Sequence, residues 1–248
     1  MTATMRFKTV SALVFIVAGC ADTDTAKTAV TDQEVVGDNG VSLNGVSLNG
    51  TDFIGATLTA GLSNGGTLAL HIDDIDALAG ANDDVLAYEI SVATDTGSTS
   101  LCGYETDGSA RRALAVPGAW NLTTGAWSDT GGTFSFACRA ASIAKCVEMG
   151  YKTWDGFADQ QHACVRMLRA DYCGDGVAHT VNGTPINIYD NVGVQADTES
   201  WQLDGEWTAD GALCFNHYRG GSMPSCSAKY STSCGSFGGG ALLINERQ

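Results

Sequence analysis

Nine cysteines restrict the folds that this 248-residue chain can adopt. Cys20 stands apart near the N-terminus, and the other eight lie far downstream. These eight are Cys102, Cys138, Cys146, Cys164, Cys173, Cys214, Cys226 and Cys234. In an exported chain an even number predicts four disulfides, with the pairing left open. There is no C-x-x-C pair and no Cys-His set at zinc-finger spacing, so we predict no metal site and no cofactor.

The N-terminal residues resemble a bacterial secretion signal. Arg6 and Lys8 precede the apolar run 10–16, and small residues lead to Cys20. This ending resembles the lipobox of bacterial lipoproteins, which implies a signal peptide over residues 1–19 and lipidation of Cys20. Because Ala21 rather than Asp follows, the resemblance also implies the outer membrane, facing the periplasm or the cell surface. The apolar run is too short to span a bilayer, so the lipid is the expected membrane contact.

The chain is strongly acidic. It carries 28 acidic and 13 basic residues, a formal net charge of −15. Such a surface repels phosphate backbones, and no basic stripe offsets it. We therefore expect no nucleic-acid partner, and an envelope protein or glycan as the candidate partner.

Composition divides the rest of the chain into three parts. Residues 20–38 are rich in Thr, Asp and Ala and predict a lipidated flexible tether. Residues 39–62 repeat every five positions and resemble pentapeptide repeats; four units are too few for a solenoid, which indicates a strand-like cap or a disordered remnant. Residues 63–240 are predicted to form a single globular domain.

Hydrophobic periodicity predicts mostly strands in that domain. Residues 67–72 and 85–92 alternate between apolar and polar side chains, and residues 201–207 and 212–218 flank an Asp-Gly turn. Helical spacing predicts one helix over 140–149 and a second ending near Ala170, capped by Thr153 or Asp155. The expected fold is α+β, mainly antiparallel β with two helices, stabilised by disulfides.

One string of residues is distinctive. Phe136-Ala137-Cys138-Arg139 and Ala144-Lys145-Cys146-Val147 precede it, and Trp207 to Ala212 follow it. Its centre is Arg169, Ala170, Asp171, Tyr172, Cys173, Gly174, Asp175 and Gly176. Residues 101–234 thereby resemble the ADYC domain, found in secreted proteins and lipoproteins of myxobacteria and their relatives. The resemblance implies no established activity, so this string is predicted to be a structural motif and no catalytic residue is assigned.

The charges around the motif allow two interpretations. Arg166 and Arg169 near a helix C-terminus complement its dipole, and Asp171 or Asp175 could pair with them, which would lock the helix to the sheet. Alternatively, His162 or His179 could work with either aspartate as a general base in an envelope hydrolase. The chain has no H-E-x-x-H or G-x-S-x-G motif to support catalysis.

A third interpretation concerns calcium. Five aspartates cluster in a short stretch, and hard cations prefer several oxygen ligands. They are Asp73, Asp74, Asp76, Asp83 and Asp84. Their spacing does not match a twelve-residue calcium loop, so a solvated acidic turn competes with a calcium-dependent adhesin. We predict an outer-membrane lipoprotein that acts as an envelope binding or structural module. The sequence leaves enzymatic activity uncertain and favours its absence. The hydrolase and the calcium-dependent adhesin are the alternatives.

Overall fold

The computed structural model describes the chain except for residues 1–14, 18–34, 37–39, 44–45, 62–66, 121–125, 129–133 and 221. Side chains are described from residue 52 on, apart from those gaps and positions 61 and 120. Cys20 and most of the predicted tether lie outside the described residues. Contacts divide the chain into two compact units. Unit 1 contains the described residues of 1–18, 22–118 and 129–138, and unit 2 contains those of 119–128 and 139–248.

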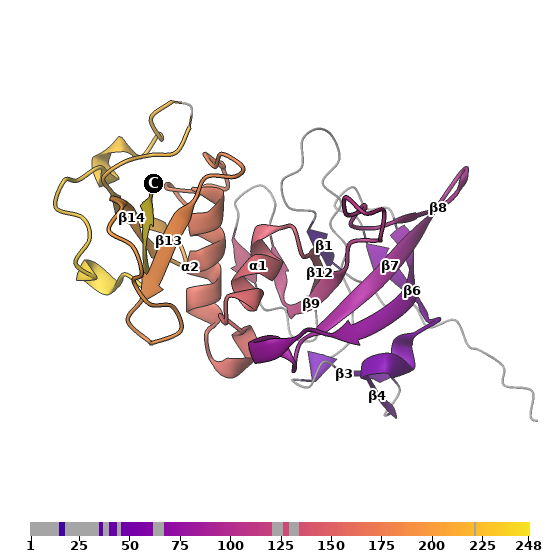
Figure 1. Cartoon of the computed structure of the whole chain (residues 1–248). Helices are drawn as coiled ribbons and strands as arrows, with labels where there is room; N and C mark the ends of the chain where they lie inside the picture. Colours follow the sequence, from indigo (N-terminus) through magenta and orange to yellow (C-terminus); the bar gives the residue numbers. More distant parts are fainter. Residues whose placement is uncertain are drawn as a thin grey trace, which may run out of the picture. The chain divides into compact units, whose positions relative to one another are not determined.

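Unit 1 is built on one large sheet (Figure 1). Its strands are β1 (Phe15–Val17), β5 (Thr57–Gly61), β6 (Thr67–Ala77), β7 (Leu86–Thr94), β8 (Gly97–Ser100), β9 (Ala113–Pro117) and β12 (Phe134–Cys138). The order is β1-β12-β9-β7-β6-β5, with β8 paired to β7. Every pair is antiparallel except β1 with β12.

A bulge adjusts the buried face of β6. Leu70 and Ile72 alternate into the core, and the register then shifts between Ile72 and Asp74. The next buried side chain is therefore Ile75, three positions later rather than two. These side chains pack with those of β7 and β12, where the Tyr88 and Phe136 rings lie 5.2 Å apart. The alternation over residues 67–72 thus predicts the first part of β6, and the bulge returns Ile75 to the same buried face.

The period-five segment takes extended backbone. β2 (Val35–Val36), β3 (Gly40–Leu43) and β4 (Val46–Asn49) form a small antiparallel sheet, followed by a 3-10 turn at Gly50–Phe53. Phe53 is buried in the core of unit 1. The last repeat enters β5, so the main sheet begins before residue 63.

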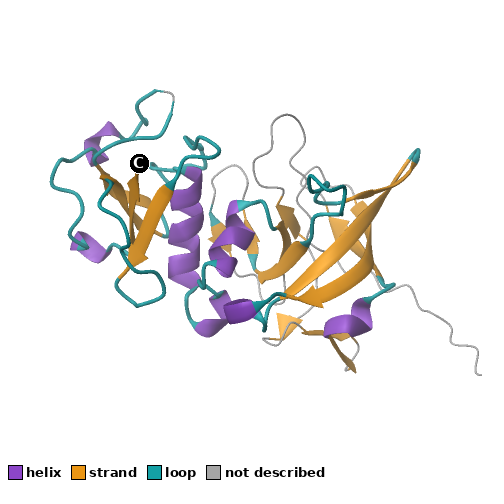
Figure 2. Ribbon diagram, viewed as in Figure 1, coloured by secondary structure: helices purple, strands orange, loops and turns teal. Residues whose placement is uncertain are grey.

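Unit 2 combines two helices with a four-stranded sheet (Figure 2). Its elements are β10 (Ala119–Trp120), β11 (Trp127–Ser128), α1 (Ser142–Glu148), α2 (Ala158–Arg169), β13 (Ile186–Asp190), β14 (Gln202–Thr208), β15 (Gly211–Phe215) and β16 (Leu243–Arg247). The sheet order is β13-β16-β14-β15, all antiparallel. Helix α2 packs against β14, β15 and β16, and α1 packs against α2. The β14–β15 hairpin turns at the predicted Asp-Gly site.

The fold is mainly antiparallel β with two α-helices, consistent with α+β. The eight downstream cysteines form four disulfides, as predicted. The pairs are Cys102–Cys138 in unit 1, and Cys146–Cys164, Cys173–Cys226 and Cys214–Cys234 in unit 2. In the described part of the chain no helix is long and apolar enough to cross a membrane.

The start of α2 differs from the prediction. Thr153 and Asp155 lie in a separate 3-10 turn, and α2 begins at Ala158 without a side-chain cap. Gly156 separates the two elements with a φ of 87°, which ends the first turn before the helix starts. Neither predicted cap is therefore used.

Candidate functional site

The Ala-Asp-Tyr-Cys motif begins where α2 ends. Ala170 takes a left-handed conformation with φ 52° and is fully buried. The Ala170 N–H donates to the carbonyl of Met167, and the Asp171 N–H donates to the carbonyl of Arg166. This is a Schellman ending, in which a residue at positive φ satisfies the last helical carbonyls. The motif's alanine is thus the helix C-cap.

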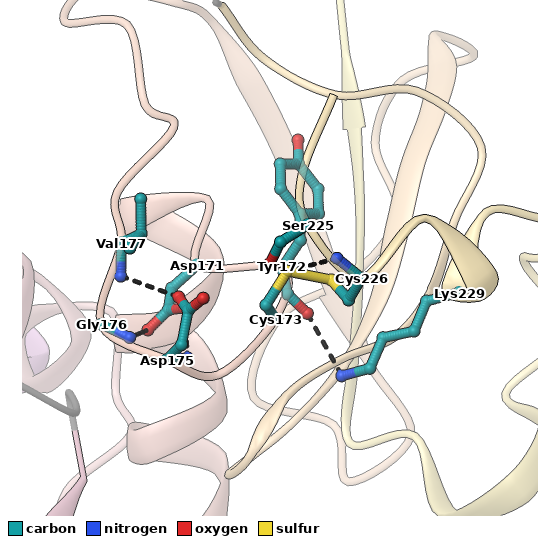
Figure 3. The surroundings of a disulfide bond; sticks show 9 residues. All are labelled: Asp171, Tyr172, Cys173, Asp175, Gly176, Val177, Ser225, Cys226 and Lys229. Carbon is teal, nitrogen blue, oxygen red and sulfur yellow. Dashed lines mark hydrogen bonds between the residues drawn. A yellow bond between two sulfur atoms is a disulfide. The ribbon is translucent and has the colours of Figure 1, made fainter. Parts of the chain in front are cut away.

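Asp171 closes the loop that follows. Its carboxylate is buried, forms an ion pair with the Arg166 guanidinium, and accepts the N–H groups of Asp175 at 3.1 Å and Gly176 at 3.0 Å. Arg166 also donates to the carbonyl of Ala209 in the β14–β15 turn. Figure 3 shows Asp171 directed at the Asp175–Gly176 backbone. Both carboxylate oxygens are therefore engaged inside the fold.

Tyr172 connects the motif to the sheet. Its hydroxyl donates to Asp204 at 2.7 Å and accepts the Arg219 N–H at 2.9 Å. Its ring packs at 5.1 Å from Trp207 and at 4.8 Å from Phe215, measured between centroids. Burial, with the nearby Asp204 charge, raises the pKa of Tyr172 above its ordinary value. The phenol is therefore a neutral structural donor.

The same network continues under Tyr172. Asp204 accepts from Arg219 Nε at 2.7 Å and from Asn245 Nδ2 at 2.9 Å, and Trp207 Nε1 donates to Asn245 at 2.7 Å. All of these side chains are buried. The pattern satisfies each charge and amide internally, as a polar cluster in a core requires.

Cys173 and Gly174 complete the motif. Cys173 is bonded to Cys226, and Lys229 Nζ donates to the carbonyl of Tyr172 at 3.3 Å (Figure 3). A Cβ on Gly174 would lie 1.8 Å from the carbonyl oxygen of Asp210, so only glycine fits beside the hairpin turn. From Ala170 to Gly174 each residue makes contacts within the fold, and the structural role of the motif stays a prediction.

The two histidines proposed for a hydrolase lie in different surroundings. His162 on α2 is buried and stacks on Trp127, with ring centroids 4.3 Å apart. Burial lowers the pKa of His162 to about 4, so its ring is neutral near pH 7. His179 is half-buried beside the Tyr172 ring at 6.0 Å, and its backbone N–H donates to the carbonyl of Arg169. Asp175 is exposed and accepts the Val177 N–H at 3.0 Å.

Three aspartates of the acidic stretch in unit 1 contact cationic or hydrogen-bonding side chains. Arg112 lies 2.6 Å from Asp74 and 2.9 Å from Asp76. Asp73 instead contacts His71 at 2.9 Å and Ser91 at 3.1 Å. The Arg112 guanidinium thus occupies the position beside Asp74 and Asp76 that a cation would take.

One group of three metal-ligand side chains comes together in the described residues. Its members are Glu206, Cys214 and Cys234. The two sulfurs are bonded to each other, and Glu206 accepts the backbone N–H groups of Gly235 and Ser236. A disulfide offers no thiolate to a metal, so this group is a structural one.

Unit 2 also has an open cleft that the sequence did not predict. Its volume is about 420 Å³, and its walls come from α1 with the residues on either side of it, the end of α2, residues 180–186 and Arg219. Lys145, Arg169 and Arg219 line it, and none of the lining residues is acidic. The residues come from four separate stretches of the chain, so no local motif could have identified the cleft.

Fold and site together define a disulfide-rich, mainly β protein whose most distinctive motif is buried structure. The family model of the ADYC domain matches residues 50–221, well over half of the chain, and the chain belongs to that family. The match starts earlier than the predicted resemblance over 101–234 and includes β5 to β8. No curated protein and no solved structure matches the chain.

Proposed function

We propose that this chain is a lipid-anchored binding module of the bacterial outer membrane and that it is not an enzyme. One observation carries the proposal: the polar groups of the family motif are engaged within the fold, whereas the cleft of unit 2 keeps cationic groups at an open surface. A catalytic motif would present its acid or base to substrate instead.

The disulfides support the proposed compartment. Four disulfides persist in oxidising surroundings such as the periplasm or the cell surface, and are rare in the cytosol. The lipobox-like ending at Cys20 supports a lipid anchor in the same compartment. Several acyl chains hold a protein at a membrane far better than one.

Labelled palmitate tests the anchor. Cells that express the full chain should incorporate label into it, and Cys20→Ser should abolish incorporation and release the protein from the membrane fraction. Ala21→Ser, one residue further, is the control and should keep the label. Equal labelling of the Cys20→Ser variant would contradict the anchor.

Binding is tested by crosslinking the full chain in an envelope extract. We expect saturable capture of an envelope component, reduced by excess unlabelled chain, with no chemical change in that component. Turnover that is lost in His179→Ala without a change in melting temperature would instead support the hydrolase.

The hydrolase and the calcium-dependent adhesin stay predictions. Calcium at millimolar concentration should raise the melting temperature of an adhesin that binds it in the folded state. No shift would exclude that alternative.

A further inference from the structure

We infer that the cleft of unit 2 binds a small organic anion, with a carboxylate or phosphate head and an apolar body. This inference rests on the proposed function as a binding module, and it names the ligand class.

The cleft is cationic in an acidic protein. Arg219 is paired with Asp204 at 2.7 Å, whereas Lys145 is exposed at the opening of the cleft. Arg169 also lines the cleft and is half-buried, and one of its contacts is a hydrogen bond to the carbonyl of Gly176 at 2.7 Å. Because the chain carries a net charge of −15, two cations on a wall without carboxylates form a local field that favours an anion.

Polar side chains can orient the head of such a ligand. Ser142 and Lys145 lie one helical turn apart on α1, so they face the cleft together. Thr180, Asn182 and Thr184 line the opposite wall with hydroxyl and amide donors. A carboxylate or phosphate oxygen accepts from all of these groups, whereas a cationic ligand would face Lys145 and Arg169.

Apolar side chains provide a place for the body. Met149, Leu168, Val181 and Ile186 complete the walls. Mostly apolar walls with a few convergent polar groups are typical of small-molecule sites of about 300–1,000 Å³. The volume of about 420 Å³ lies within this range and suits a compact ligand.

The walls are held in place before any ligand arrives. Cys146–Cys164 ties α1 to α2. The backbone N–H of His179 donates to the carbonyl of Arg169, and the N–H of Thr184 donates to the carbonyl of Val181, which fixes the facing loop. A preformed site avoids the entropy cost of ordering its walls on binding.

Calorimetric titration of the full, oxidised chain tests the inference with probes of one length. Hexanoate and hexyl phosphate should bind, and hexanol and hexylamine should bind about tenfold more weakly or not at all, since a charge-assisted hydrogen bond contributes this much. The relative affinities of hexanoate and hexyl phosphate show whether the cleft prefers a carboxylate or a phosphate head. Equal affinity for hexanol and hexanoate, or binding of none of the probes at millimolar concentration, would overturn the inference.

Variants locate the site. Lys145→Gln should weaken hexanoate about tenfold and Lys145→Glu should abolish binding, with the melting temperature kept because Lys145 is exposed. Arg111→Gln removes one positive charge from unit 1 and should leave affinity unchanged. Unaltered affinity in Lys145→Glu would place the anion elsewhere and overturn the inference.

The two proposals fail in different ways. If the chain captures an envelope component while the anions do not bind, the anion site is wrong and the binding module stands. If capture also fails, the proposed function fails with it. Capture that Lys145→Glu abolishes, together with hexanoate binding, supports both.

Discussion

At the scale of single residues, Asp171 and Arg166 form a pair with almost no access to water. Asp171→Asn keeps the shape but leaves the Arg166 guanidinium buried without its counter-ion. Breaking a buried pair by removing one partner costs about 3–5 kcal/mol of unfolding free energy. We expect a loss of this size in denaturant titrations.

Asp175→Asn is the matched control. Asp175 is exposed and accepts one backbone N–H, so its loss should cost less than about 1 kcal/mol. Equal losses in the two variants would contradict the structural role of Asp171.

Replacing Gln161 by an apolar residue should raise the stability of the fold. Its side chain is fully buried in α2, and neither amide atom has a hydrogen-bond partner among the residues that the structure describes. An unsatisfied buried polar group costs about 1–3 kcal/mol, so Gln161→Met should stabilise the fold by about 1–2 kcal/mol. Gln160→Met on the same helix is only partly buried and should change stability by less than about 0.5 kcal/mol. A lower melting temperature for Gln161→Met would indicate that the amide is satisfied.

At the scale of elements, the motif loop and the β14–β15 turn touch through backbone. Gly174→Ala would drive a methyl group into the carbonyl of Asp210, in addition to the strain of a φ of 72°. Gly108→Ala carries similar strain at φ 86° but meets nothing within 4 Å. We expect about 1 kcal/mol of destabilisation for Gly108→Ala and more than about 3 kcal/mol for Gly174→Ala. Comparable melting temperatures for both variants would show that the loop moves freely from the turn.

The strands and the hairpin were predictable because their signals are local. Alternation in β6 and β7 and the Asp-Gly turn each lie within a dozen residues. The bulge at Ile72 and the start of α2 were not predictable from the sequence. Packing, and no particular residue type, determines a register shift and the start of an uncapped helix.

The site was predictable in part for the same reason. Asp171 and Arg166 are five residues apart, so their pairing could be proposed from sequence. Asp204 finds Arg219 and Asn245 at separations of 15 and 41 residues, on neighbouring strands and loops. Only the topology of the fold brings these groups together, and the same is true of the four stretches that line the cleft.

At the scale of the whole molecule, acid should destabilise the fold at a higher pH than carboxylate titration alone would produce. At the end of β13, burial would raise the pKa of Asp190, but hydrogen bonds from Tyr151 and the backbone of Gln195 overcome this and lower it. The stability that Asp190 contributes is therefore lost only below its ordinary pKa of 3.8. A loss of stability at a higher pH must therefore come from a group that is charged in the unfolded chain and that folding keeps neutral.

His162 is that group. Burial lowers its pKa from 6.5 to about 4, while Asp159 and Asp210 act to raise it and Arg166 to lower it. Between these values the unfolded chain binds a proton that the folded chain excludes, so the free energy of unfolding falls as the pH drops from 6.5 to 4. At about 1.4 kcal/mol per pKa unit, the loss reaches up to about 3 kcal/mol.

Denaturant titrations between pH 6.5 and 4 should show this decline in the wild type and in His71→Gln, whose imidazole is exposed. His162→Phe should flatten it, because an aromatic ring without a titrating nitrogen can still stack on Trp127; an unchanged slope in His162→Phe would assign the acid sensitivity to other groups.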